Sequence, residues 1–239
     1  MRLPKALDPS PIKEAVVEIR FETPLPSEAV FGVVYNAIHD GYPELEKLPI
    51  LQVPEAVRAA DPNLMFQPHY RLKRDNYLVQ IGPRVLSVNS VGRYPGWEKF
   101  LSEIEFVFSK VHDLEIVQRV TRFGIRYVDF FDLDVFKILK LRILLEEEDV
   151  QSSSMLCRII FKRGDFQSAL HLSNEATFSR EGEARNGSLL DLDTYLAEGH
   201  REFFTQMRGL LEESHQVQKE LFFSLLRPDF LESLHPTYE

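Results

Sequence analysis

The chain has 239 residues, of which 44% are hydrophobic and 27% are charged, and its formal net charge at pH 7 is −9. This composition excludes a mostly disordered chain, and the negative charge argues against nucleic acid as a partner, because duplex binding usually needs a broad basic face. Charges interrupt every apolar run before the roughly 18 residues that a membrane-spanning helix needs. We therefore expect a cytoplasmic protein with no membrane segment.

The first predicted element is a strand over residues 12–22, where apolar and charged side chains alternate. One side of it carries Ala15, Val17, Ile19 and Phe21, and we expect this side to lie under helices. The other side carries Glu14, Glu18, Arg20 and Glu22, and we expect it to meet solvent or a basic row on a neighbouring strand.

The following segments predict a helix, a meander of strands and a second helix. Ser27 is a candidate N-cap for a helix over residues 28–39. Extended runs separated by tight turns then cover residues 61–72, 77–82 and 83–92. Apolar residues at spacings of three and four predict a helix from Trp97 to Val111.

The second part of the chain repeats this order of elements. It begins with a long strand or strand pair over residues 115–132, in which Gly124 predicts a bulge or kink, and a segment of ambiguous period over 134–148, interpreted as a short helix running into a strand. Strands over 155–162, 167–173 and 188–195 and a long helix over 200–226 follow. The polar stretch 174–187 is expected to be a loop.

The order strand, helix, strands, helix therefore occurs twice, over about residues 11–114 and 115–228. We expect one α+β unit over residues 1–239. Its antiparallel sheet would come from two similar halves, with the long helices packed on one face.

Several stretches resemble a sporadically distributed prokaryotic family of uncharacterised proteins of about 250 residues. They are PIKEAVVEIRFETP, DPNLMFQPHYRL, NYLVQIGPRVLSVN, YPGWEKF and VTRFGIRYVDFF, within residues 11 to about 131. The resemblance implies no assigned activity and no catalytic residues. Patchy distribution goes with mobile or accessory genes, so the resemblance points to an accessory, defence or toxin–antitoxin-associated component.

No familiar catalytic or nucleotide-binding signature occurs, and the seven histidines are never spaced as a local metal pair. We therefore expect no catalytic residue, no cofactor and no metal. Asp191 and Asp193 share one side of a strand, which fits a solvated face better than a cation site. Cys157 lies in an apolar run and is expected to be a small buried side chain.

Two groups of residues are candidates for ligand binding. The first comprises strand arginines with a tyrosine nearby: Arg20, Arg71, Arg84, Arg122 and Arg126, with Tyr70 or Tyr127. These arginines would either converge on a phosphate or carboxylate, or pair with glutamates on neighbouring strands. The second is the stretch VGRYPGWEKF, where Tyr94 and Trp97 flank a turn before a helix. It would form a recognition pocket with Arg93 at its rim, or Trp97 would simply begin the core.

The absence of catalytic motifs and the wide apolar stripe on the last helix favour a noncatalytic binding or assembly protein. It would form a homo-oligomer or bind a protein partner. The alternative is an enzyme or small-ligand protein that holds a phosphate- or carboxylate-bearing molecule in an arginine-lined pocket.

Overall fold

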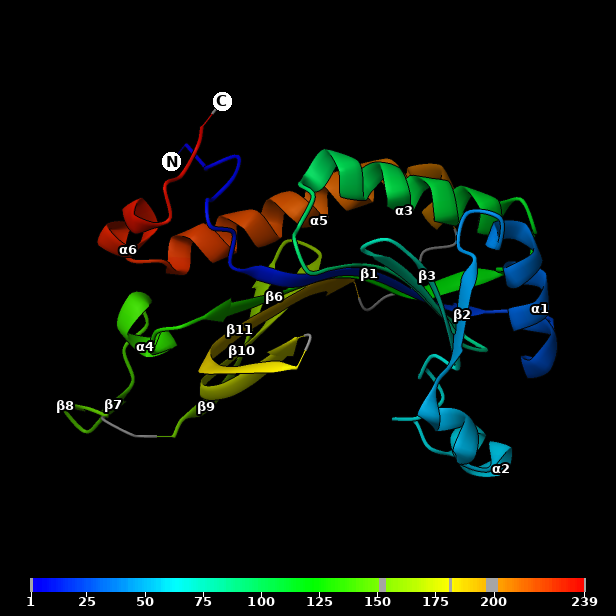
Figure 1. Ribbon diagram of the computed structural model, residues 1–239, viewed down its shortest axis with the longest axis horizontal. Coiled ribbons are helices and arrows are strands. Elements are labelled where there is room, and N and C mark those ends of the chain that lie inside the picture. Colours follow the sequence, from blue (N-terminus) through cyan, green and yellow to red (C-terminus); the bar gives the residue numbers. More distant parts are fainter. Residues whose placement is uncertain (1, 151–153, 181, 197–201, 239) are drawn as a thin grey trace.

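The computed structural model describes residues 2–150, 154–180, 182–196 and 202–238. Its strands are β1 (Ile12–Glu22), β2 (Glu44–Lys47), β3 (Tyr70–Arg74), β4 (Tyr77–Ile81), β5 (Val85–Val91), β6 (Arg119–Phe131), β7 (Leu144–Leu145), β8 (Glu148–Asp149), β9 (Leu156–Arg163), β10 (Phe166–Arg180) and β11 (Glu183–Leu196). Within the described ranges, β7 and β8 form a separate hairpin, and the other nine form one antiparallel sheet in the order β2-β3-β4-β5-β1-β6-β11-β10-β9 (Figure 1). The predicted α+β class with an antiparallel sheet is confirmed.

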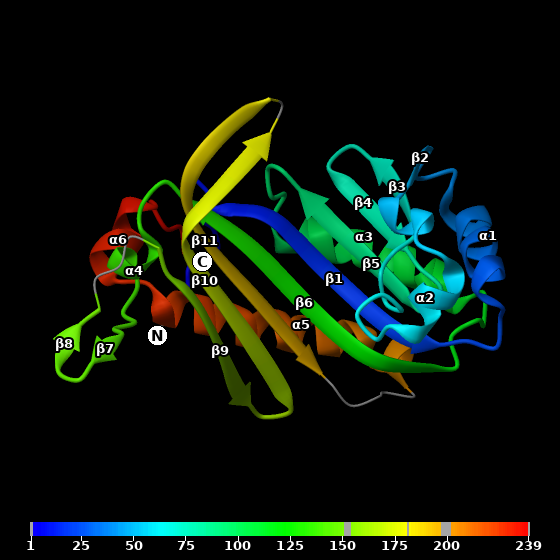
Figure 2. The ribbon, with the colours of Figure 1, turned by 90° about the horizontal axis from the view of Figure 1, so that it is seen from below.

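The helices lie around this sheet. They are α1 (Ser27–Ile38), the 3-10 helix η1 (Pro49–Gln52), α2 (Glu55–Ala60), α3 (Trp97–His112), α4 (Val135–Ile138), α5 (Phe203–Leu225) and α6 (Pro228–Ser233). Figure 1 shows α3 and α5 along the same face of the sheet. Figure 2 shows the opposite face, where α2 lies over strands of the first half of the chain.

Strand β1 lies in the middle of the sheet between β5 and β6. Val17 is opposite Val88 on one side and Ile125 on the other. The side chains of Ala15, Val17, Ile19 and Phe21 are at most 2% exposed, so the predicted buried side of this strand is confirmed.

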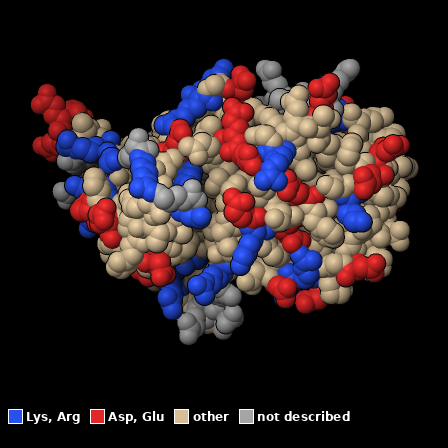
Figure 3. Space-filling model, turned by 90° about the horizontal axis from the view of Figure 1, so that it is seen from above, with Lys and Arg blue, Asp and Glu red and all other residues tan. Residues whose placement is uncertain are grey.

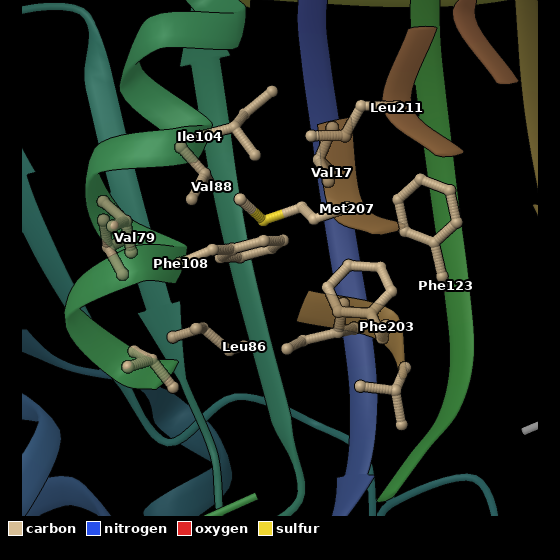
Figure 4. Packing of buried hydrophobic residues seen from close by; sticks show 14 of the residues in the cluster. Val17, Val79, Leu86, Val88, Ile104, Phe108, Phe123, Phe203, Met207 and Leu211 are labelled. Atoms are coloured by element: carbon tan, nitrogen blue, oxygen red, sulfur yellow. The ribbon is translucent and has the colours of Figure 1, made fainter. Parts of the chain in front are cut away.

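The main core lies between this face of the sheet and the two long helices. Figure 4 shows Ile104 and Phe108 of α3 and Phe203, Met207 and Leu211 of α5 gathered over Val17. Their spacings of three and four residues put them on one side of each helix, which explains why both helices bury a continuous stripe. A second cluster joins α4, α6 and the end of α5 to strands β10 and β11.

The two ends of the chain meet beside this second cluster. The backbone N–H of Lys5 donates to the carbonyl of Thr237 over 2.6 Å, and the N–H of Thr237 donates to Ala6 over 2.9 Å. The N–H of Asp8 also donates to the carbonyl of Leu234. These bonds hold the N-terminal segment against the body of the molecule.

Three local predictions differ from the structure. The polar stretch 174–187 is not a loop, because Thr177 pairs with Asn186 and extends the β10–β11 hairpin. The register irregularity in β6 lies at residue 121 rather than at Gly124, which instead leaves room for the guanidinium of Arg122. The helix α6 follows α5 directly, and the sequence analysis did not predict it.

Candidate functional site

A cavity of about 270 Å³ lies between the sheet and the two long helices, with residues 4–7 and 10–12 of the N-terminal segment as one wall. Three elements supply the polar and aromatic side chains that the following argument uses. They are β6 with Tyr127 and Asp129, α3 and the turn before it with Trp97 and Tyr94, and α5 with His215 and Gln218. Most of the remaining wall is apolar, including Leu192, Phe222 and Phe223. This combination of an apolar wall and a few convergent polar groups is typical of small-ligand sites.

The periodicity of each element explains why these side chains meet. Tyr127 and Asp129 are two residues apart on a strand, so both point to the helix-covered face. His215, Gln218 and Phe222 are three and four residues apart on α5, so they share the side that faces the sheet.

A chain of hydrogen bonds crosses the cavity wall. The hydroxyl oxygens of Tyr94 and Tyr127 are 3.1 Å apart, and the Tyr127 oxygen is 3.2 Å from Nδ1 of His215. All three groups are satisfied when Tyr94 donates to Tyr127 and Tyr127 donates to His215. The ring of Trp97 stacks on His215 with centroids 3.9 Å apart, so the imidazole is held on two sides.

The His215 ring stays neutral in this setting. Burial, assisted by the nearby charge of Lys219, lowers its pKa from 6.5 to about 3. The ring contacts a phenol rather than a serine or cysteine, so it lacks the nucleophile of a catalytic pair in this contact. The arrangement therefore suits binding and orientation of a ligand.

Asp129 is a carboxyl group placed in the interior. It is 2% exposed, and its Oδ1 has no hydrogen-bond partner among the described residues. Burial, assisted by the nearby charge of Asp191 and opposed by that of Lys13, raises its pKa to about 8. At neutral pH the group is therefore mostly protonated, and it lines an apolar cavity with an oxygen free to accept.

Gln218 is the second buried polar group on this wall. It is 3% exposed, and its Nε2 donates to the backbone carbonyl of Leu192 over 2.6 Å. Its Oε1 has no partner in the described part of the chain. A buried oxygen left without a donor costs on the order of 1–3 kcal/mol of stability. A ligand that donates a hydrogen bond to either oxygen would recover part of this cost.

A more polar chamber of about 880 Å³ adjoins the cavity and shares Leu7, Ser10, Ile12 and Tyr94 with it. Lys13, Arg93 and Asp132 are among the residues that line this chamber. Of the predicted pair, Tyr94 therefore lies at the boundary of the two spaces, whereas Arg93 lines the polar chamber. Trp97 is both part of the core and part of the cavity wall, so the two interpretations of its role coincide.

The candidate arginines lie elsewhere, and most pair with carboxylates. Arg126 makes a bidentate contact with Asp191, at 2.7 and 2.6 Å. Arg122 binds Glu18 at 3.1 Å and Asp193 at 2.6 Å. Four of the five carry ion pairs, since Arg20 also pairs with Glu18 and Arg71 with Glu46. Strand alternation puts all four on the sheet face opposite α3 and α5. This is the paired alternative, not an open anion pocket.

The other candidates of the arginine group are separated from it. Arg84 is exposed in the turn before β5 and makes no ion pair with a described residue. Tyr70 stacks on Phe31 of α1 with centroids 3.7 Å apart. Strand alternation puts Tyr70 and Tyr127 on the helix-covered face, so neither accompanies the arginines as expected.

Charge and metal-binding features add no second site. Figure 3 shows basic and acidic side chains interspersed over the helix-covered face. No group of three potential metal ligands occurs among the described residues, and Asp191 and Asp193 are in ion pairs. Of the described helices, none has the length and apolar character needed to cross a bilayer.

Comparison with known proteins gives no family assignment. No model of a known protein family matches the chain, and no curated protein matches it. The resemblance noted for residues 11–131 therefore stays a prediction.

Sequence reasoning identified Tyr94 and Tyr127 but missed Asp129, His215 and Gln218. A signal for Asp129 was present, because the alternation of β6 puts this carboxyl group on the same side as Ile125 and Tyr127. His215 and Gln218 likewise adjoin the apolar stripe of α5. A polar residue within a buried stripe marks a candidate site, but it does not identify which distant residues will meet it.

Proposed function

We propose that the protein is a noncatalytic binding protein, and that its ligand is a small, mostly apolar molecule held in the cavity beneath the N-terminal segment. The observation that carries the proposal is the buried Asp129, which lines an apolar cavity and whose Oδ1 has no donor among the described residues. A protein retains such a group at a cost in stability, which a bound ligand offsets.

The cavity also has the rigidity that a binding site needs. Its polar wall is fixed by the Tyr94–Tyr127–His215 chain and by the stacking of Trp97. Side chains held in this way lose little further freedom when a ligand binds, so more of the contact energy appears as affinity.

A thermal-shift screen of small uncharged and amine-bearing ring compounds tests the proposal. A ligand at 100 times its Kd stabilises the folded state by about 2.7 kcal/mol, which is a measurable rise in Tm. The matched variants are Ser10→Phe, which fills the space shared by the two chambers, and Ser102→Phe, on the exposed side of α3.

We expect compounds that stabilise the natural protein to stabilise Ser102→Phe equally and Ser10→Phe much less. A screen in which no compound raises the Tm counts against the proposed function. Equal stabilisation of the two variants would put the binding site elsewhere.

Assembly with a protein partner or a second copy is the second candidate function. The edge strand β9 supports it, because Leu156 is 81% exposed and Ile160 is 47% exposed on a strand with one unpaired edge. Light scattering at micromolar concentrations tests self-association. Under this hypothesis the natural chain is larger than a monomer and Ile160→Lys is monomeric, whereas a monomeric natural chain contradicts it.

We further propose that the two halves of the chain are similar units whose long helices share one face. The strand order supports this, because β5, β4 and β3 follow outward from β1 as β11, β10 and β9 do from β6. On this proposal the cavity lies where the helices of the two halves meet, since α3 and α5 both contribute to its wall. The cytoplasmic location and the family resemblance stay predictions.

A further inference from the structure

On the basis of the proposed function, we propose that the buried end of the ligand carries N–H donors, as a primary amide or an amine does, and that Asp129 and Gln218 accept them. The proposal names the functional group that the cavity recognises. It deepens the proposed function rather than adding a second site.

The argument rests on which polar atoms are already used. The hydroxyls of Tyr94 and Tyr127 and the Nδ1 atom of His215 bond to one another. Gln218 uses its nitrogen on the backbone of Leu192. What remains in the interior is a pair of oxygen acceptors, Asp129 Oδ1 and Gln218 Oε1, neither with a partner among the described residues.

Oxygen acceptors select for donors. A carboxylate ligand has only acceptor oxygens, so beside Gln218 Oε1 it leaves acceptor facing acceptor in a desolvated space, and the single proton of the Asp129 carboxyl offsets this at one oxygen at most. An amide or ammonium group supplies two or three N–H donors, which is enough for both oxygens. Sites built in this way discriminate strongly against analogues that lack the matching group.

Two lysines on the same wall could attract an anion instead. Lys5 is exposed and Lys219 is half-buried, so both belong to the more solvated part of the wall, whereas Asp129 and Gln218 are at most 3% exposed. Solvated charges contribute little to selectivity compared with buried hydrogen-bonding groups. The buried groups Asp129 and Gln218 therefore determine which functional group the buried end of the ligand carries.

The apolar part of the wall accommodates the rest of such a ligand. Trp97, Leu192 and Phe222 offer ring and aliphatic surfaces of the kind that hold a saturated or aromatic ring. Cyclohexane derivatives are suitable probes, because they fill such a space and do not absorb where tryptophan does.

The experiment uses Trp97, the single tryptophan of the chain, as the reporter. The intrinsic fluorescence is titrated with cyclohexanecarboxamide, cyclohexylmethylamine, cyclohexylmethanol and cyclohexanecarboxylate. We expect the amide and the amine to bind at least about tenfold more tightly than the carboxylate, which corresponds to about 1.4 kcal/mol or more.

Two variants assign the selectivity to the named residues. An ammonium ligand favours the ionised form of Asp129, and Asp129→Asn keeps an acceptor oxygen but cannot ionise. It should therefore weaken binding of the amine about tenfold and leave the amide within about threefold. Gln218→Met should weaken both donors. Gln216→Met is the matched control on the exposed side of α5, and it should change neither.

The outcomes separate the two proposals. If the carboxylate binds as tightly as the amide and the amine, the donor inference is overturned while the cavity remains a binding site. If the alcohol matches both nitrogen compounds, the inference fails in the same way. If none of the four compounds changes the fluorescence of Trp97, the proposed function itself fails. The ranking on the natural protein decides these cases even if a variant does not fold.

Discussion

At the scale of single residues, Asp129 and His215 line the same cavity, and burial shifts their pKa values in opposite directions. Burial keeps the proton on the Asp129 carboxyl and keeps an extra proton off the His215 ring. Both groups are therefore neutral near pH 7, and the cavity presents hydrogen-bonding groups with little net charge.

Asp129 should make the protein less stable as the pH rises. Its pKa is about 8 in the folded state and 3.8 ordinarily, so between these values the folded protein holds a proton that the unfolded chain has released. The free energy of unfolding therefore falls from pH 4 to pH 8. We expect the stability of Asp129→Asn relative to the natural protein to increase across this range, by on the order of 5 kcal/mol at pH 8.

His215 has the opposite effect on the free energy of unfolding, which it makes rise with pH between about pH 3 and 6.5. In this range the unfolded chain binds a proton that the folded ring does not. Half-buried His69 acts in the same sense. The other charges that bear on Asp129 are Asp191 and Lys13, with Lys219 on the same cavity wall. Urea unfolding of the natural protein and of Asp129→Asn at several pH values measures the difference in their free energies of unfolding. A difference that stays constant between pH 4 and pH 8 contradicts the raised pKa of Asp129.

The Tyr127 hydroxyl should contribute measurably to stability. Tyr127→Phe leaves His215 and Tyr94 without their shared partner in a mostly buried site, so we expect a loss of about 1–3 kcal/mol in urea unfolding. Tyr35→Phe is the control, because the Tyr35 hydroxyl makes no hydrogen bond to a described residue. Equal effects of the two changes would show that the chain of bonds contributes nothing.

At the scale of elements, β1 provides a test of the assigned register. Ile19 is fully buried, so Ile19→Ala should cost about 2–5 kcal/mol through lost transfer energy and a residual cavity. Leu45→Ala on β2, where the side chain is 45% exposed, should change the stability by about 0.5 kcal/mol or less. If the two changes cost the same in chemical denaturation, the register of β1 is wrong.

Two glycines should respond in opposite ways to replacement by alanine. A Cβ atom at Gly187 of β11 would lie 2.3 Å from the carbonyl oxygen of Phe131, so Gly187→Ala must shift the backbone and should lower the Tm. A Cβ at Gly32 of α1 meets nothing within 4 Å, so Gly32→Ala should stabilise by about 0.5–1 kcal/mol. A calorimetric scan in which Gly187→Ala is neutral would contradict the close packing of β6 and β11.

The elements also show what sequence can predict. β1 and α3 match their predicted ranges closely, because strict alternation and three- and four-residue spacing each fit one structure. The ends of β10 and β11 were missed, because their outer parts are polar and gain their order from pairing with each other. Local composition does not report such long-range pairing.

At the scale of the whole molecule, the site depends on contacts between residues far apart in the chain. Tyr94 lies in the turn before α3, Tyr127 on β6 and His215 on α5, and the wall is completed by a segment near the N-terminus. The sequence shows which side chains are present, but strand order and helix packing determine which of them lie close together. For this reason the fold class was predictable, while the cavity and its buried acceptors were not.

The most direct test of the central claim is a 19F NMR titration of protein labelled with 5-fluorotryptophan. The chain has a single tryptophan, so one resonance reports on the cavity wall at Trp97. During titration with cyclohexanecarboxamide, we predict that this resonance moves progressively and saturates. A resonance that stays fixed at concentrations where the same compound raises the Tm would place the binding site elsewhere and contradict the account.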